Sequence, residues 1–254
     1  MVGLGPGDAR HRTPAAVEAV RGADTIVGFG PYVDQCADLV RPEQRVVRSG
    51  MGDEAARAID AIDAALAGRR VALVSSGDPG VFAMASVTLE LAAERAPGLA
   101  VRVVPGVTAA QAAGALVGAP LAHDHAAISL SDRLTPWAAI EARLHAAADS
   151  DLVVALYNPR SRDRTAHLPR ALEVLAADRP PGTPVAFVTN ASRPGESVRT
   201  TTIAEAADHL DAVDMNTIVL VGSSDTAVLD GRVVTRRHHP RPDGPDRDDR
   251  TTDA

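Results

Sequence analysis

Five short stretches carry residues that could bind a small molecule, and each begins at the end of an apolar run. Glycine and proline turns in such places let the backbone approach a ligand closely, and the polar side chains beside them could hold it. Because the carboxyl ends of parallel strands meet at one edge of a sheet, these turns are expected to line a cleft. They read VGLGPGD from Val2, SSGDPGV from Ser75, VPGVTAA from Val104, LYNPRSR from Leu156 and VTNASRP from Val188.

The opening loop does not fit a dinucleotide or a nucleoside triphosphate. Counted from Gly3, the sixth position of the G-x-G-x-x-G fingerprint is Asp8, and counted from Gly5 it is also not glycine. Pro6 lacks the amide hydrogen that would help to hold a pyrophosphate. The sequence contains no lysine, which a Walker-type phosphate loop or Schiff-base chemistry requires. A tight turn without a ligand remains the alternative to a loop that approaches another kind of small molecule.

The composition is that of a globular protein with an acidic balance. The chain has 254 residues, of which 45% are hydrophobic, and its formal net charge is −7. This charge argues against a nucleic-acid partner, which selects a basic surface. Cys36 is the single cysteine, so we expect neither a disulfide framework nor a thiolate metal site, and we predict no metal. No apolar stretch has the length of a membrane span, so we expect a cytoplasmic protein without a membrane partner.

Short apolar runs alternate with Ala-rich helical stretches, which is typical of an α/β fold with a parallel or mixed sheet. We expect two α/β domains, residues 1–117 and 118–235, with a ligand cleft between them and a disordered tail over residues 236–254. The first strand has few residues before its glycine, so the sequence predicts that translation starts further upstream. The predicted strands are 2–4, 25–29, 45–48, 71–75, 101–104, 126–130, 152–157, 185–189 and 217–221. The predicted helices are Pro14–Ala23, Glu54–Ala67, Ala83–Ala96, one after Thr108, Trp137–Ala147, Thr165–Asp178 and Ile203–Leu210.

Several polar residues in the turns have a structural alternative to ligand binding. Asp78 could cap the helix that follows it, and the Thr108 hydroxyl could cap its own helix. Arginines crowd the last two turns; a single one is usually solvated, whereas a group beside a cleft suits a ligand with several carboxylates. These arginines are Arg160, Arg162, Arg164, Arg193 and Arg199, of which Arg160, Arg162 and Arg199 are the predicted substrate-binding residues.

The five turns and the later run TIVLVGSS resemble the tetrapyrrole methyltransferase family in their order and spacing, over residues 2–235. The resemblance implies the tetrapyrrole methylase fold, in which S-adenosylmethionine (SAM) binds between two α/β domains, and it suggests a homodimer. SAM carries no phosphate, so its loops need neither a lysine nor a string of free amides. By this resemblance the cofactor-binding residues are Pro6, Ser76, Gly77, Asp78, Val81, Thr108, Ala109, Tyr157, Asn158, Asn190 and Ala191.

The stretches GAPLAHDHAAISLSDRLTPW and YNPRSRDR are similar to one branch of this family. That branch methylates carbon 17 of a precorrin ring in cobalamin biosynthesis, and the ring contracts as a bridging carbon leaves it as an acetyl group. Methyl transfer mainly needs alignment, whereas contraction removes a hydroxyl proton and favours a general base. We expect Asp132 to handle that proton or to orient the substrate, with Ser131 as its hydrogen-bond partner and His123 as a second candidate. The alternatives are a helix-capping role for Asp132 and a structural role for His123.

Other functions remain open from the sequence. A sister enzyme of the same fold could methylate another tetrapyrrole carbon, as in uroporphyrinogen-III methylation. A branch that methylates ribosomal RNA would need a basic surface. A non-catalytic SAM-binding module would bind the cofactor without transferring its methyl group. The substrate could be a metal-free ring or a ring that carries cobalt.

Overall fold

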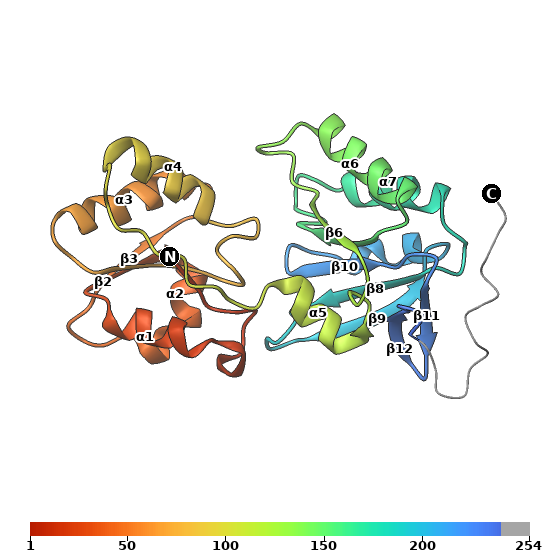
Figure 1. Cartoon of the computed structure of the whole chain (residues 1–254), viewed down its shortest axis with the longest axis horizontal. Coiled ribbons are helices and arrows are strands. Elements are labelled where there is room, and N and C mark those ends of the chain that lie inside the picture. The colour runs from red at the N-terminus through yellow and green to blue at the C-terminus, as the bar shows by residue number, and fades with distance from the viewer. Residues whose placement is uncertain (240–254) are drawn as a thin grey trace.

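The computed structural model describes residues 1–239, which form two α/β halves that lie side by side (Figure 1). The first half contains a parallel sheet with the strand order β1–β4–β2–β3. Helices α1 and α2 cover one face of this sheet, and α3 and α4 cover the other. The elements are β1 (Val2–Gly3), the 3-10 helix η1 (Ala9–His11), α1 (Pro14–Gly22), β2 (Thr25–Phe29), α2 (Gly30–Gln35), the 3-10 helix η2 (Ala37–Leu39), β3 (Arg45–Ser49), α3 (Glu54–Leu66), β4 (Val71–Ser75) and α4 (Ala85–Arg95).

The central strands of the first sheet are buried on both faces. Ile26 and Val74 belong to the apolar cluster that contains α1. Val27 and Leu73, which alternate with them along the same two strands, belong to the cluster that contains α3 and α4. A strand buried on both faces reads as a continuous apolar run, which is why the sequence located these strands well.

The second half contains a mixed sheet with the strand order β6–β7–β10–β8–β9. Strand β10 runs antiparallel to both of its neighbours, so β7 and β8 point the same way. Helices α6 and α7 pack on one face, and α5 packs on the other. The elements are α5 (Ala109–Val117), β5 (Gly118–Ala119), β6 (His125–Ser129), α6 (Trp137–Asp149), β7 (Val153–Tyr157), α7 (His167–Ala177), β8 (Pro184–Thr189), β9 (Ser197–Thr202), the 3-10 helix η3 (Ala206–Ala212), β10 (Thr217–Val221), β11 (Thr226–Leu229) and β12 (Arg232–Thr235).

Most predicted elements are present, and the exceptions have physical reasons. The predicted strand 101–104 is wrong: it contributes one bridge, in which Gly3 N donates to Val104 O at 2.9 Å and Val104 N donates to Met1 O at 2.9 Å. The predicted helix over 203–210 is instead η3, a 3-10 helix. Strand β9 was not predicted, because it is a largely exposed edge strand without apolar alternation.

Helix α5 belongs by its packing to the second half. Ala113 and Val117 lie in the same apolar cluster as Val188 and Leu220 of the second sheet. The predicted boundary after residue 117 stays a prediction, and this packing leads us to propose that the second unit begins with α5. Residues 236–239 of the predicted tail contain no helix or strand, and residues 240–254 lie outside the described part of the chain.

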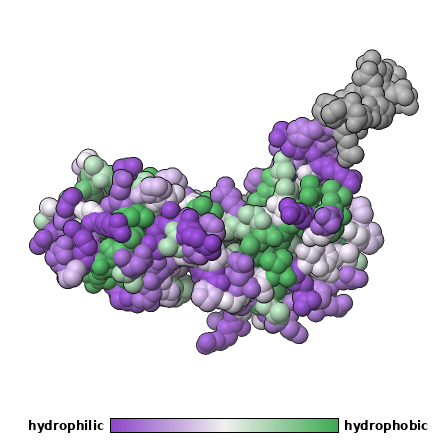
Figure 2. All heavy atoms as spheres, turned by 90° about the horizontal axis from the view of Figure 1, so that it is seen from below, coloured by the Kyte–Doolittle hydropathy of each residue, from purple (hydrophilic) through white to green (hydrophobic). Residues whose placement is uncertain are grey.

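Within residues 1–239, no helix combines the length and apolar character needed to cross a membrane. The face seen in Figure 2 is mostly hydrophilic, with hydrophobic side chains gathered in separate areas on the two halves. Exposed apolar side chains include Leu116 on α5 and Val228 on β11.

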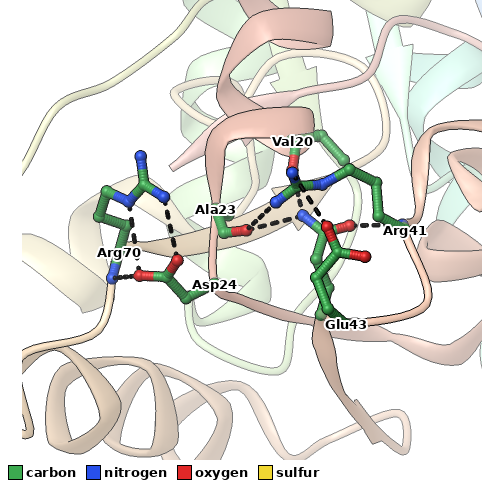
Figure 3. A network of polar contacts seen from close by, with 7 residues as sticks. Val20, Ala23, Asp24, Arg41, Glu43 and Arg70 are labelled. Carbon is green, nitrogen blue, oxygen red and sulfur yellow. Dashed lines mark hydrogen bonds and ion pairs between the residues drawn. The ribbon is translucent and has the colours of Figure 1, made fainter.

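The carboxyl end of α1 is held by the buried side chain of Gln44, in the network drawn in Figure 3. Gln44 Nε2 donates to the carbonyl oxygens of Val20 and Ala23, both at 2.8 Å. Its Oε1 accepts from the Arg41 amide at 2.7 Å. A single amide side chain therefore supplies the shortest hydrogen bond to each of two carbonyls at the helix end, whose other donors lie at 3.3 and 3.5 Å.

Substitution of Gln44 tests this cap. We expect Gln44→Ala to lower the free energy of unfolding by about 1–3 kcal/mol, because two buried carbonyls lose their donor. Glu43→Ala is the matched control: its ion pair with Arg41 is exposed, and such pairs contribute about 0–1 kcal/mol. Urea unfolding measures both variants, and equal changes would contradict the role given to Gln44.

The single cysteine gives a second test of the core. Burial raises the pKa of the Cys36 thiol to about 11, so the native thiol stays protonated at neutral pH. Because the thiolate is the reactive form, we expect a chromogenic disulfide reagent at pH 8 to leave the native protein unlabelled. One thiol per chain should react once denaturant is added, and rapid labelling without denaturant would show that this core opens.

Candidate functional site

Three glycine turns of the first half interlock at the carboxyl ends of the strands. Gly5 N donates to Gly77 O at 3.1 Å, and Gly77 N donates to Gly5 O at 2.7 Å. A Cβ atom on Gly106 would overlap the Gly77 carbonyl oxygen and would lie 2.9 Å from the carbonyl carbon of Gly3. These glycines therefore let the turns approach one another, which differs from our interpretation that they make room for a ligand.

Asp78 joins two of these turns. Its Oδ1 accepts from Gly80 N at 2.7 Å, and its Oδ2 accepts from Gly106 N at 2.9 Å. The capping alternative for Asp78 is wrong, because α4 begins at Ala85 and its cap position is Met84. The carboxylate instead holds the second and third turns in one arrangement.

Tyr157, at the end of β7, connects the second half to the turns of the first. Its hydroxyl lies 2.8 Å from the Thr108 hydroxyl and accepts from Ala110 N at 3.1 Å. The Thr108 hydroxyl does not cap α5 as expected. The Tyr157 hydroxyl instead accepts from the Ala110 amide at the start of this helix. The rings of Phe82 and Tyr157 are 5.0 Å apart, and Phe82 has a φ of 50° that bulky residues rarely adopt. Phe82 and Tyr157 thus bring the two halves into contact beside Thr108.

Two asparagines follow the parallel strands β7 and β8 and lie at the same edge of the sheet. Asn158 and Asn190 have φ values of 51° and 53°, a left-handed conformation that asparagine tolerates better than most residues. Asn158 Nδ2 donates to the Ser129 hydroxyl at 2.9 Å, which joins the ends of β6 and β7. Ala191 is buried next to Asn190.

Arg193 connects this edge to the glycine loops of the first half. Its Nε donates to Pro6 O at 2.5 Å, and its Nη2 donates to the Ser76 hydroxyl at 2.6 Å. The neighbouring Ser192 hydroxyl lies 2.6 Å from His11 Nδ1. Arg193 therefore joins the turn after β8 to two predicted cofactor residues of the first half. The sequence analysis listed Arg193 only as one of five arginines in the last two turns.

A hollow of about 580 Å³ opens beside this contact, lined by Gly7, Tyr32, Gln35 and Arg193 among others. Three hydrogen bonds from Arg10 lower the pKa of the nearby Asp8 carboxyl to about 2, and this ion pair places one negative and one positive group on the rim. Another hollow, of about 560 Å³, lies inside the first half against β1 and contains none of the predicted site residues.

The predicted substrate arginines differ in their contacts. Arg160 Nη1 donates to the carbonyl oxygen of Leu210 at 2.5 Å, so this side chain anchors η3. Arg164 is buried, and its Nη2 donates to Asn158 O at 2.8 Å, so it is neither solvated nor open to a ligand. The exposed side chains of Arg162 and Arg199 have no hydrogen-bond or ion-pair partner among the described residues.

Asp132 lies in the loop after β6, beside a histidine that the sequence analysis missed. The capping alternative is wrong, because α6 begins after Pro136 without a side-chain cap. Asp132 Oδ2 lies 3.5 Å from His167 Nε2. No sequence signal paired these residues, because Asp132 precedes α6 whereas His167 is the first residue of α7, and they meet only where the two helices pack together. Ser131 N donates to the Ser129 hydroxyl at 3.2 Å, so Ser131 bonds within its own loop and not to Asp132.

His123 does not join this group. It precedes β6, whereas Asp132 follows it, and a strand of five residues spans about 13 Å. His123 Nδ1 accepts from the amide of Asp124 at 2.7 Å, which is a local structural contact. Among residues 1–239, no group of three or more His, Cys, Asp or Glu side chains could hold a metal ion.

Comparison with known families defines the class of protein. The family model described as Tetrapyrrole (Corrin/Porphyrin) Methylases matches residues 1–207, so the chain belongs to this family. A probable cobalt-factor III C(17)-methyltransferase of Salmonella typhimurium is 43% identical over 93% of this chain and 97% of that protein. A precorrin-3B C(17)-methyltransferase of a Sinorhizobium species is 42% identical over 91% of this chain and 90% of that protein.

The crystal structure of a methyltransferase called CobJ has the same fold. It superimposes with a TM-score of 0.87 at 41% identity and covers 92% of this chain and 98% of its own. These findings confirm the predicted family and fold class. Several other curated relatives are longer, and this chain spans about half of their length, 48% in one case and 45% in another.

The interlocked turns generate a prediction for Gly106. We expect Gly106→Ala to destabilise the protein by about 1–3 kcal/mol or more and to weaken cofactor binding, because the added methyl overlaps the Gly77 carbonyl. Gly182→Ala is the control, since a Cβ there meets nothing within 4 Å. Thermal unfolding with and without SAM measures both effects, and equal behaviour of the two variants would contradict the interlock.

Proposed function

We propose that this chain transfers a methyl group from SAM to carbon 17 of precorrin-3B, or of its cobalt-bearing counterpart, and contracts the ring. The main support is that relatives matched along nearly their whole length are named C(17)-methyltransferases of these two substrates. The two relatives are 43% and 42% identical to this chain, so the experiment tests the substrates of both.

The residues at the junction fit SAM by their chemistry. Hydroxyl and amide groups of Ser76, Thr108 and Asn158 can bind ribose and adenine, and the Arg193 guanidinium matches the carboxylate of the amino-acid tail. SAM supplies a methyl group on a positively charged sulfur. The contribution of the chain is to hold the ring carbon in line with that methyl, which is mainly a matter of position. A related structure, a uroporphyrin-III C-methyltransferase from Thermus thermophilus, was solved in complex with S-adenosyl homocysteine.

The remaining predicted site residues also belong to this proposal. We propose that Gly77, Asp78 and Val81 shape the cofactor loop and that Asp132 handles the proton. We further propose a homodimer in the cytoplasm, which rests on the family resemblance. The exposed apolar areas in Figure 2 offer faces on which two copies could pack.

The experiment that tests the function is anaerobic incubation of the protein with methyl-labelled SAM and either precorrin-3B or cobalt-factor III. We expect one added methyl by mass and the absorption change of a contracted ring with at least one of the two substrates. Methylation without contraction would indicate another tetrapyrrole carbon. Tight SAM binding without transfer to either ring, or to uroporphyrinogen-III, would favour a non-catalytic SAM-binding module.

Arg162, whose side chain has no partner among the described residues, provides a further prediction. We expect Arg162→Ala to raise the Michaelis constant for the tetrapyrrole roughly tenfold with little change in turnover, because a charged hydrogen bond contributes about 1.5–3 kcal/mol. Arg160→Ala should mainly lower thermal stability, because it frees η3. Steady-state kinetics measure both variants. An unchanged Michaelis constant in Arg162→Ala would show that this side chain does not bind the substrate.

A further inference from the structure

Asp132 and His167 face each other at the amino-terminal ends of the neighbouring helices α6 and α7. The Asp132 Oδ2 and His167 Nε2 atoms are 3.5 Å apart, and the aspartate side chain is 44% exposed whereas the histidine side chain is 16% exposed. The His167 ring stacks on Trp137 with ring centres 4.3 Å apart and planes 6° from parallel. Asp132 is therefore open to a ligand, while the histidine behind it is held by an aromatic ring.

The second nitrogen of His167 shows which proton the ring carries. Among the described residues, His167 Nδ1 is buried and has no hydrogen-bond partner. A buried N–H without an acceptor costs more than an unfilled lone pair, because the donor loses its whole hydrogen bond to water. The neutral ring with its hydrogen on Nε2 leaves only a lone pair unsatisfied at Nδ1. In that tautomer, Nε2–H is on the nitrogen that lies 3.5 Å from the Asp132 carboxylate, and a small shift of either side chain would bring it into hydrogen-bond geometry.

The surroundings of Asp132 connect it to the cofactor loop. Arg164 interacts electrostatically with Asp132, and His167 lies against the Asp132 carboxylate. Arg164 also donates to Asn158 O, and Asn158 donates to the Ser129 hydroxyl. A continuous set of contacts therefore runs from the predicted cofactor loop to the loop that carries Asp132.

We infer that His167 is a positioning residue, which holds the Asp132 carboxylate toward the cleft so that it removes the hydroxyl proton during ring contraction. This inference rests on the proposed function, because it assigns a role within that reaction. Asp132 would be the catalytic residue, and His167 would act only through it.

The hydroxyl proton moves to an Asp132 carboxylate oxygen, and the electron pair of the broken O–H bond becomes the second bond of the new carbonyl group. The electron pair of one ring bond at that carbon shifts to a neighbouring electrophilic ring carbon and closes the smaller ring. The π pair that this electrophilic carbon gives up moves into the conjugated system of the macrocycle. His167 neither gains nor loses a proton, and its Nε2–H keeps the second carboxylate oxygen in place.

Two substitutions of His167 separate this role from a structural one. His167→Phe keeps the stack on Trp137 and removes the donor, so we expect normal stability, methylation within about twofold of the wild type and contraction slowed at least about tenfold. His167→Gln loses the stack but places an amide donor near the Nε2 position, so it should keep more of the contraction rate than His167→Phe. Single-turnover assays follow methyl incorporation by mass and contraction by absorbance. Asp132→Asn serves as the reference for complete loss of the base and should slow contraction by about 10²–10⁴-fold.

The outcomes separate the inference from the proposed function. Contraction at the wild-type rate in His167→Phe, or equal losses in the Phe and Gln variants, would overturn the role of His167. A wild-type protein that methylates neither ring would instead overturn the proposed function. Nitrogen NMR of the His167 ring tests the contact without any substrate. We expect the ring to carry its hydrogen on Nε2, and we expect Asp132→Asn to change the ring nitrogen signals. An Nδ1–H tautomer would overturn the inference.

Discussion

The close backbone contact among the turns of Gly3, Gly77 and Gly106 is the constraint on which the site depends. No side chain fits between these turns, so the ends of the first sheet are held by peptide groups and by the Asp78 carboxylate. Backbone contacts of this kind have few alternative arrangements, because they leave no rotatable side chain at the point of contact. The loops that follow, with Pro6 and Ser76, are therefore presented to the second half in one geometry.

The two halves meet on this rigid edge through a small number of side chains. Tyr157 reaches Thr108 and the start of α5, and Arg193 reaches Pro6 and Ser76. The contact of Tyr157 with Thr108 and the contacts of Arg193 join the second half to turns of the first half. Predicted cofactor-binding residues that are far apart in the sequence come together because both sheets direct their strand ends to the same junction.

Binding and proton handling are assigned to different parts of the second half. The ends of β7 and β8 carry Asn158 and Asn190 at the junction, whereas Asp132 and His167 lie where α6 and α7 begin. Arg164 is buried, donates to Asn158 O and interacts electrostatically with Asp132. Because its Nε has no hydrogen-bond partner among the described residues, the contact with Asn158 is one that this buried side chain can hardly lose. The two steps of the proposed reaction, methyl transfer and ring contraction, would therefore use different residues of the same half of the molecule.

The sequence by itself determined the family, the alternation of strands and helices, and the five turns that carry the site. Strands such as Val71–Ser75 and Thr217–Val221 were located at their observed bounds, because burial on both faces leaves a continuous apolar run. The same signal predicted a strand at residues 101–104, which are mostly apolar but make a single bridge. It also missed the strand Ser197–Thr202, which is largely exposed. Only the tertiary structure decided that Asp78 ties two turns together, that Arg193 joins the halves and that His167 faces Asp132. Local patterns record burial and backbone preference, whereas these contacts join residues whose separation is set by how whole helices and sheets pack.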